Sequence, residues 1–136
     1  SKGFPYTTVC RNDMAKAGLV KTPLHVQFVF GLKNALPAKK DILEFQVKQL
    51  KSLMPDATWT AAGIGKSQLD INKWSLELKG NCRTGLEDNI RYNKERLATS
   101  NAELVARVSR LCKEHGRKVA TAKEARELLS LPMLPK

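Results

Sequence analysis

Histidine and cysteine are scarce in this sequence. It contains two histidines, His25 and His115, which lie far apart in the chain. The three cysteines, Cys10, Cys82 and Cys112, are odd in number and follow no metal-ligand spacing. This usage excludes a disulfide framework and a zinc-finger site, and it is typical of a reducing compartment. We therefore expect a cytoplasmic protein, with the reservation that a targeting segment would be lost if the natural N-terminus lies upstream.

Long apolar runs are also lacking, and aromatic residues are few, at 6% of the sequence. No run of 18 apolar residues and no signal peptide appear, so nothing predicts membrane spanning or secretion. The formal net charge of +11 raises the hypothesis of a nucleic-acid partner. However, the basic residues are spread over predicted helix exteriors and are not interleaved with aromatics. A solvated basic surface is the favoured interpretation, and we expect neither a membrane nor a nucleic-acid partner.

The apolar pattern predicts helices that alternate with three strands. Strands are expected over residues 24–30, 57–64 and 82–84, and helices over residues 7–17, 39–54, 68–78, 100–115 and 121–129. Pro55 and Gly116 mark helix ends, and the pairs Ser100/Glu103 and Thr121/Glu124 have the spacing of capping boxes. This alternation predicts an α/β fold with parallel strands and right-handed crossovers.

The first of these strands carries one histidine and one glutamine in an otherwise apolar run. Such a run is typical of a parallel strand that is buried on both faces. His25 and Gln27 share one face, so they would lie together in the interior of a barrel. For His25 we favour a hydrogen-bonded structural role over a functional one.

Charged groups of both signs gather in residues 83–89 (RTGLEDN). Glu87 and Asp88 are adjacent, which raises the pKa of one carboxyl unless a metal or an arginine compensates, and Arg83 lies four residues before Glu87. The alternative interpretation is a helix that begins near Asn89, where two carboxylates would face exposed N–H groups. The sequence leaves both interpretations open.

A glycine-rich loop follows the second strand, in residues 63–67 (GIGKS). Gly65, Lys66 and Ser67 precede a helix, an arrangement that can hold the phosphate groups of a coenzyme. A glycine turn that closes onto a helix also explains the pattern without any ligand.

Several separated segments resemble the beta-keto acid cleavage enzymes, a family that includes the 3-keto-5-aminohexanoate cleavage enzyme. The resemblance rests on residues 23–31 (PLHVQFVFG), 59–65 (WTAAGIG), 83–89 (RTGLEDN), 100–105 (SNAELV), 119–121 (VAT) and 124–126 (EAR). These segments follow the family's order and span about residues 15–131. One departure is residues 79–82 (KGNC), where the family usually has a Gly-Gly-His-Val type of sequence.

The resemblance implies the second half of a (β/α)8 TIM-type barrel. A complete barrel needs about 250 residues, so 136 residues supply around half. We therefore expect one partial domain over residues 1–136, with about three parallel strands and two open strand edges. A missing N-terminal half, another subunit or homo-oligomer formation would cover those edges.

The resemblance also implies a zinc-dependent reaction in which a beta-keto acid and acetyl-CoA give acetoacetate and a new CoA ester. By that resemblance Glu87 is a zinc ligand, Asp88 is the base and Arg83 orients Asp88. Gly65, Lys66 and Ser67 would contact the coenzyme. The family's His-x-His zinc ligands have no counterpart here, so the other ligands are expected from the missing half, and this chain alone is expected to be inactive.

A second hypothesis is a noncatalytic remnant or subunit of the same scaffold that binds a partner through its basic surface. A start codon just before Ser1 would favour it, whereas an upstream His-x-His would favour the enzyme.

Overall fold

A three-stranded parallel sheet lies at the centre of the protein, in a computed structural model that describes residues 12–132. Its strands, in spatial order, are β1 (His25–Phe30), β2 (Thr58–Gly63) and β3 (Asn81–Cys82). β1 pairs with β2 along its whole length, from His25 opposite Thr58 to Phe30 opposite Gly63. The predicted fold class is confirmed, because three parallel strands alternate with helices as in part of a TIM-type barrel.

The helices lie close to the predicted ranges. They are α2 (Lys40–Leu53), the short 3-10 helix η1 (Gly65–Ser67), α3 (Gln68–Glu77), α4 (Asn101–Glu114) and α5 (Ala122–Leu128). Residues 12–16 are also helical, and the first part of the helix that was expected over residues 7–17 lies outside the described residues. Within residues 12–132, no helix is both long enough and apolar enough to span a bilayer.

Local capping chemistry explains where the last two helices begin. Before α5, the Thr121 hydroxyl accepts from the Glu124 amide at 3.2 Å, and the Glu124 carboxylate accepts from the Thr121 amide at 2.7 Å. This predicted capping box is therefore confirmed. Before α4, Ser100 accepts from the Glu103 amide, but the Glu103 carboxylate accepts from Thr99 at 2.9 Å. The capping box predicted for Ser100 and Glu103 is therefore only half formed, because the Glu103 carboxylate binds the Thr99 amide instead of the Ser100 amide.

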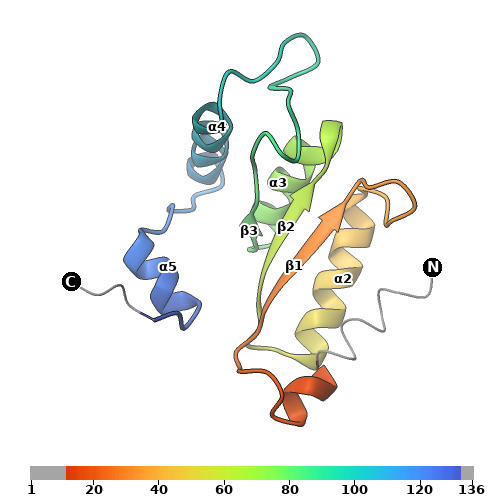
Figure 1. Cartoon of the computed structure of the whole chain (residues 1–136), viewed down its shortest axis with the longest axis vertical. Helices are drawn as coiled ribbons and strands as arrows, with labels where there is room; N and C mark the ends of the chain where they lie inside the picture. The colour runs from red at the N-terminus through yellow and green to blue at the C-terminus, as the bar shows by residue number, and fades with distance from the viewer. Residues whose placement is uncertain (1–11, 133–136) are drawn as a thin grey trace.

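One face of the sheet is buried by α2 and α3. Figure 1 shows β1 and β2 lying across these two helices. The core between them consists mainly of Val26, Phe28, Phe30, Leu43, Leu50, Trp59, Ala61 and Ile71. Burial of these apolar side chains is the main force that holds the layers together.

His25 and Gln27 are exposed on the opposite face of the sheet. The expectation that β1 is buried on both faces is wrong for this chain, because no described element covers that face (Figure 1). His25 is nevertheless fully hydrogen-bonded, with Nδ1 2.8 Å from the Thr58 hydroxyl and Nε2 2.9 Å from the Thr60 hydroxyl. The structural interpretation of His25 is the one that the contacts support.

Gly80 lies against the core, where there is no room for a side chain. A Cβ atom added at Gly80 would lie 2.2 Å from the Trp59 ring, which is itself buried. We expect Gly80→Ala to lower the free energy of unfolding by about 1–3 kcal/mol, since overpacking forces neighbours out of place. Urea denaturation of the chain measures this change. Gly85→Ala is the comparison, because its Cβ would meet Asn101 Oδ1 at 3.3 Å, a tight contact that a shift of a few tenths of an ångström relieves. Equal midpoints for the two variants would contradict the prediction.

Candidate functional site

The predicted site residues lie together at the carboxyl ends of the strands. Gly31 follows β1, the glycine-rich loop follows β2, and residues 83–89 follow β3. The Gly65 amide donates to the Asp88 carbonyl at 2.7 Å, and a Cβ at Gly31 would lie 3.2 Å from Ser67 Oγ. The three loops therefore share one rim of the sheet, as the barrel arrangement predicts.

β3 is shorter than predicted and begins one residue earlier. It covers Asn81–Cys82 where residues 82–84 were expected, although the Arg83 amide still donates to the Ala61 carbonyl at 3.0 Å. The Asn81 side chain supports the early start, because its Nδ2 donates to the Trp59 carbonyl at 2.9 Å.

A turn, not a helix, carries the two carboxylates. Residues 86–88 form this turn, and the chain then folds back in a short antiparallel bridge between Arg91 and Leu97. The alternative of a helix starting near Asn89 is therefore wrong. The two carboxylates therefore do not lie on the first turn of a helix.

Arg83 is a partner of both carboxylates. Its Nε and Nη2 donate to the two Asp88 oxygens at 2.9 and 2.7 Å, and Nη2 also donates to Glu87 Oε2 at 2.7 Å. The Asp88 side chain is 2% exposed, whereas that of Glu87 is 81% exposed. A bidentate guanidinium contact fixes the plane of the carboxylate as well as its position. Asp88 is consequently held rigidly, and Glu87 points an oxygen to solvent.

The two carboxyl groups titrate differently. Burial raises the pKa of Asp88, as does Glu87, while Arg83 opposes the rise. The pKa of Glu87 is lowered by a hydrogen bond from the Asp88 carboxyl and by Arg83. Adjacent carboxyl groups with separated pKa values are suited to different chemical roles. Here Asp88 has the greater affinity for a proton.

The carboxylates and the glycine-rich loop line the same hollow. It has a volume of about 530 Å³ and is bounded by Ile64, Gly65, Lys66, Leu86, Glu87, Asp88, Asn89, Ile90 and Arg91. The structure thus brings Gly65 and Lys66 together with Glu87 and Asp88. Ser67 does not line this hollow and lies instead against Gly31, where an added Cβ would be 3.2 Å from Ser67 Oγ.

Backbone geometry explains both glycines of the loop. A Cβ at Gly63 would lie 2.5 Å from the Ser67 carbonyl, and Gly65 has a φ of +59°. The Gly65 amide is already bonded to the Asp88 carbonyl. A glycine turn without a ligand therefore accounts for the pattern, and coenzyme binding by Gly65, Lys66 and Ser67 stays a prediction.

Glu87 is suited to contribute one oxygen ligand to a metal. It is at the rim and uses one oxygen for Arg83. Among residues 12–132, no three His, Cys, Asp or Glu side chains are grouped to hold a metal ion. Cys82 offers no thiolate, since burial raises its pKa to about 12. The Cys82 thiol instead donates to the Asn72 carbonyl, at 3.3 Å.

Sequence reasoning missed three residues that hold the carboxylate turn, the turn of residues 86–88 that carries Glu87 and Asp88. Gln68 and Asn101 hydrogen-bond the backbone of Gly85 and Leu86, and Arg107 binds Gln68. In the sequence, Gln68 and Asn101 have the positions of ordinary first residues of helices. Arg107 resembles the other basic residues on predicted helix exteriors. Only the buried positions of Gln68 and Arg107 distinguish them.

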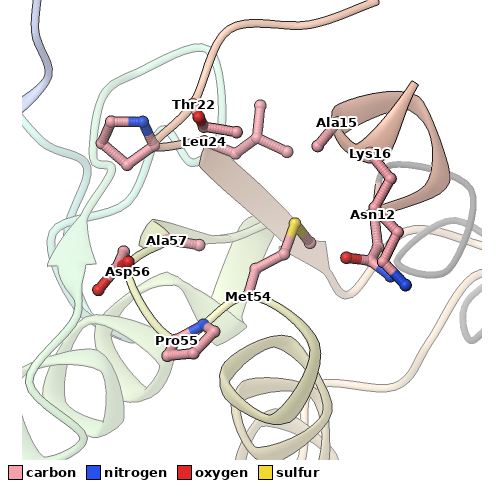
Figure 2. Close-up of a pocket in the computed structure, with 10 residues that line it drawn as sticks. Asn12, Ala15, Lys16, Thr22, Leu24, Met54, Pro55, Asp56 and Ala57 are labelled. Atoms are coloured by element: carbon pink, nitrogen blue, oxygen red, sulfur yellow. The ribbon is translucent and has the colours of Figure 1, made fainter. Parts of the chain in front are cut away.

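Another hollow lies at the opposite end of the strands. Its volume is about 540 Å³, and Figure 2 shows Leu24, Met54, Pro55 and Asp56 around it, with Asn12 and Lys16 at its side. It shares no residue with the carboxylate site.

Comparison with known proteins agrees with the motifs. The sequence model of the family named beta-keto acid cleavage enzyme matches residues 8–131. The chain is 56% identical over 121 residues to a 3-oxoadipate:acetyl-CoA acetyltransferase of Cupriavidus necator, covering 89% of this chain and 43% of that relative. It is 40% identical over 116 residues to a 3-keto-5-aminohexanoate cleavage enzyme of Fusobacterium nucleatum, covering 85% of this chain and 41% of the relative. The chain therefore spans less than half the length of these curated relatives.

Proposed function

Since the chain belongs to the beta-keto acid cleavage enzyme family, we propose that it is part of a zinc-dependent enzyme that converts a beta-keto acid and acetyl-CoA to acetoacetate and a new CoA ester. The observation that carries this proposal is the Arg83 guanidinium, bonded to both Asp88 and Glu87 at the strand-end rim. Two relatives named for beta-keto acids, one of them also for acetyl-CoA, support the choice of substrates.

Asp88 is the proposed base. It removes a proton from the carbon between the two carbonyl groups of the keto acid, leaving an enolate. Burial raises the pKa of its carboxyl, which brings the proton affinity nearer to that of a useful base at neutral pH. The bidentate contact with Arg83 keeps its oxygens in one orientation, so little motion is needed before proton transfer.

Glu87 is the proposed zinc ligand of this chain. Zinc accepts carboxylate oxygen, and the low pKa of Glu87 keeps that oxygen ionised. When bound, zinc would polarise the keto-acid carbonyl as a Lewis acid. Catalytic zinc normally has three protein ligands, so the remaining ligands come from outside the described residues.

Lys66 is the proposed cation for the coenzyme. Its side chain is exposed on the hollow that Glu87 and Asp88 also line. An acidic coenzyme entering there would meet Lys66 and Arg91 before its thioester reached the carboxylates. Gly65 and Ser67 would then shape the loop around the phosphate groups.

A chimera tests the proposed function. The 121 residues of the Cupriavidus necator relative that match this chain are replaced by the chain's own residues. With 3-oxoadipate and acetyl-CoA, we expect the chimera to form acetoacetate and a new CoA ester, which chromatography separates. A folded chimera that forms neither product would contradict the proposal and favour the noncatalytic subunit.

Arg83 and Glu87 should fail in different ways in this chimera. Arg83→Ala should lower turnover about a hundredfold and retain most of the zinc, because its proposed task is to position Asp88. Glu87→Ala should lose zinc first and activity as a consequence. Metal analysis and steady-state kinetics measure the two effects. Lys73→Ala, at an exposed position of α3, is the control. Equal zinc loss in the Arg83 and Glu87 variants would reduce Arg83 to a structural role.

A further inference from the structure

The carbonyl oxygen of Gly85 anchors the turn that carries the two carboxylates. It accepts from the amides of Asp88 and Asn89, at 3.3 and 3.2 Å, and from Nε2 of Gln68, at 3.0 Å. The first two bonds lie within the turn, whereas the third joins the turn to α3. Gln68 therefore links the position of the turn to the sheet layer on which α3 packs.

Arg107 fixes which way the Gln68 amide faces. Its Nη2 donates to Gln68 Oε1 at 3.0 Å, and both side chains are buried, with Gln68 0% and Arg107 6% exposed. A guanidinium can only donate hydrogen bonds, so it requires the amide oxygen on its side. The amide nitrogen of Gln68 is then left facing the Gly85 carbonyl, where it donates.

Packing alone does not explain a guanidinium at position 107. Arg107 donates to the Tyr92 carbonyl, and its Cζ lies 5.1 Å from the centre of the Tyr92 ring. No carboxylate of residues 12–132 forms an ion pair with it, and burial lowers its pKa. Burying a charge among neutral acceptors is costly, and an apolar side chain would fill the space at lower electrostatic cost.

We propose that Gln68 and Arg107 are positioning residues, which hold the Gly85 carbonyl and thereby set where Glu87 and Asp88 stand. The assignment of a catalytic purpose rests on the proposed function; the contacts themselves do not. α4 strengthens the hold through a second residue, because Asn101 Oδ1 accepts from the Leu86 amide at 2.7 Å. The turn is thus fixed from two helices, through Gly85 and through Leu86.

Gln68→Glu separates positioning from simple burial. The new carboxylate pairs with Arg107, so the buried charge gains a counter-ion and the site keeps its volume. The second oxygen, however, faces the Gly85 carbonyl and cannot donate to it while Arg107 keeps the carboxylate ionised. If the pair only fills space, this variant is harmless; if it positions the turn, the turn loosens.

Hydrogen exchange in the 136-residue chain, followed by NMR, makes the measurement. In Gln68→Glu we expect the amides of Gly65, Asp88 and Asn89 to exchange about tenfold faster, the effect of losing one hydrogen bond. Gln49→Glu makes the same chemical change on α2 and should leave these rates unaltered. Arg107→Lys is a second variant, which keeps the charge but not the two-pronged donor, and should also speed the exchange. Unaltered rates in whichever of these variants fold would overturn the proposal.

The chimera shows the catalytic consequence. Gln68→Glu should lower kcat about a hundredfold, with the KM for acetyl-CoA retained. An unaltered kcat would overturn the catalytic purpose of the pair. Inactivity of the unsubstituted chimera would instead remove the proposed function, and the exchange rates would still decide whether Gln68 and Arg107 hold the turn.

Discussion

Asp88→Asn should reduce turnover of the chimera by about a thousandfold, within the range that general base catalysis supplies. Asparagine has nearly the same shape and keeps one of the two contacts with Arg83, because its oxygen can accept although its NH2 group cannot. It cannot take a proton from the keto acid. Steady-state kinetics measures the loss, and Asp70→Asn, on the first turn of α3, is the matched control. Turnover retained by Asp88→Asn would remove Asp88 as the base.

The dependence on pH provides an independent readout of the same residue. Asp88 must be ionised to act, so kcat/KM should fall as the pH drops through its pKa. Burial raises that pKa above the ordinary aspartate value, which moves the acid limb of the profile upward. Glu87 titrates at lower pH, because hydrogen bonding from Asp88 and Arg83 lowers its pKa. An acid limb below the ordinary aspartate range would contradict the assignment.

Mixed with the remaining part of the Cupriavidus necator relative, the chain should gain both zinc and activity, which it should lack alone. One carboxylate at Glu87 cannot replace the three protein ligands that catalytic zinc normally requires. Metal analysis after dialysis and product formation measure the two properties. Stoichiometric zinc in the chain alone would contradict the assignment and point to His25 or Cys82 as ligands.

The surface that such a segment would cover is open in this chain. β1 and β3 are the two edges of the sheet, and the face with His25 and Gln27 is uncovered. Beside β3, a hollow of about 700 Å³ is lined by residues of α4 and α5, including Val105, Val108 and Leu128. Unpaired edges next to apolar side chains favour association with another strand. If the remaining part of the Cupriavidus necator relative does not bind the chain, this prediction of association is wrong.

Features governed by near neighbours could be inferred from the sequence. The alternation of helices and strands follows from apolar spacing, and α2 ends just before Pro55 as expected. The start of α5 follows from Thr121 and Glu124, which are three residues apart. The family was recognised from motifs in their order, and the match over residues 8–131 confirms it. The roles of Arg83, Glu87 and Asp88 stay predictions.

Features that depend on which distant segments meet required the folded chain. The register of β3 is set by its pairing with β2 and by the bond from Asn81 to Trp59, so its start could not be read from residues 82–84. The exposure of His25 depends on what covers the sheet, because the apolar run of β1 is the same with or without a cover.

The anchor of the carboxylate turn shows the same dependence. Gln68 and Arg107 are 39 residues apart, and no periodicity or motif relates them. Capping bonds and apolar spacing are fixed by a few consecutive dihedral angles, so they leave a local signature in the sequence. The direction of a buried amide is fixed by the donor that the fold brings against it. That direction therefore leaves no local signature in the sequence.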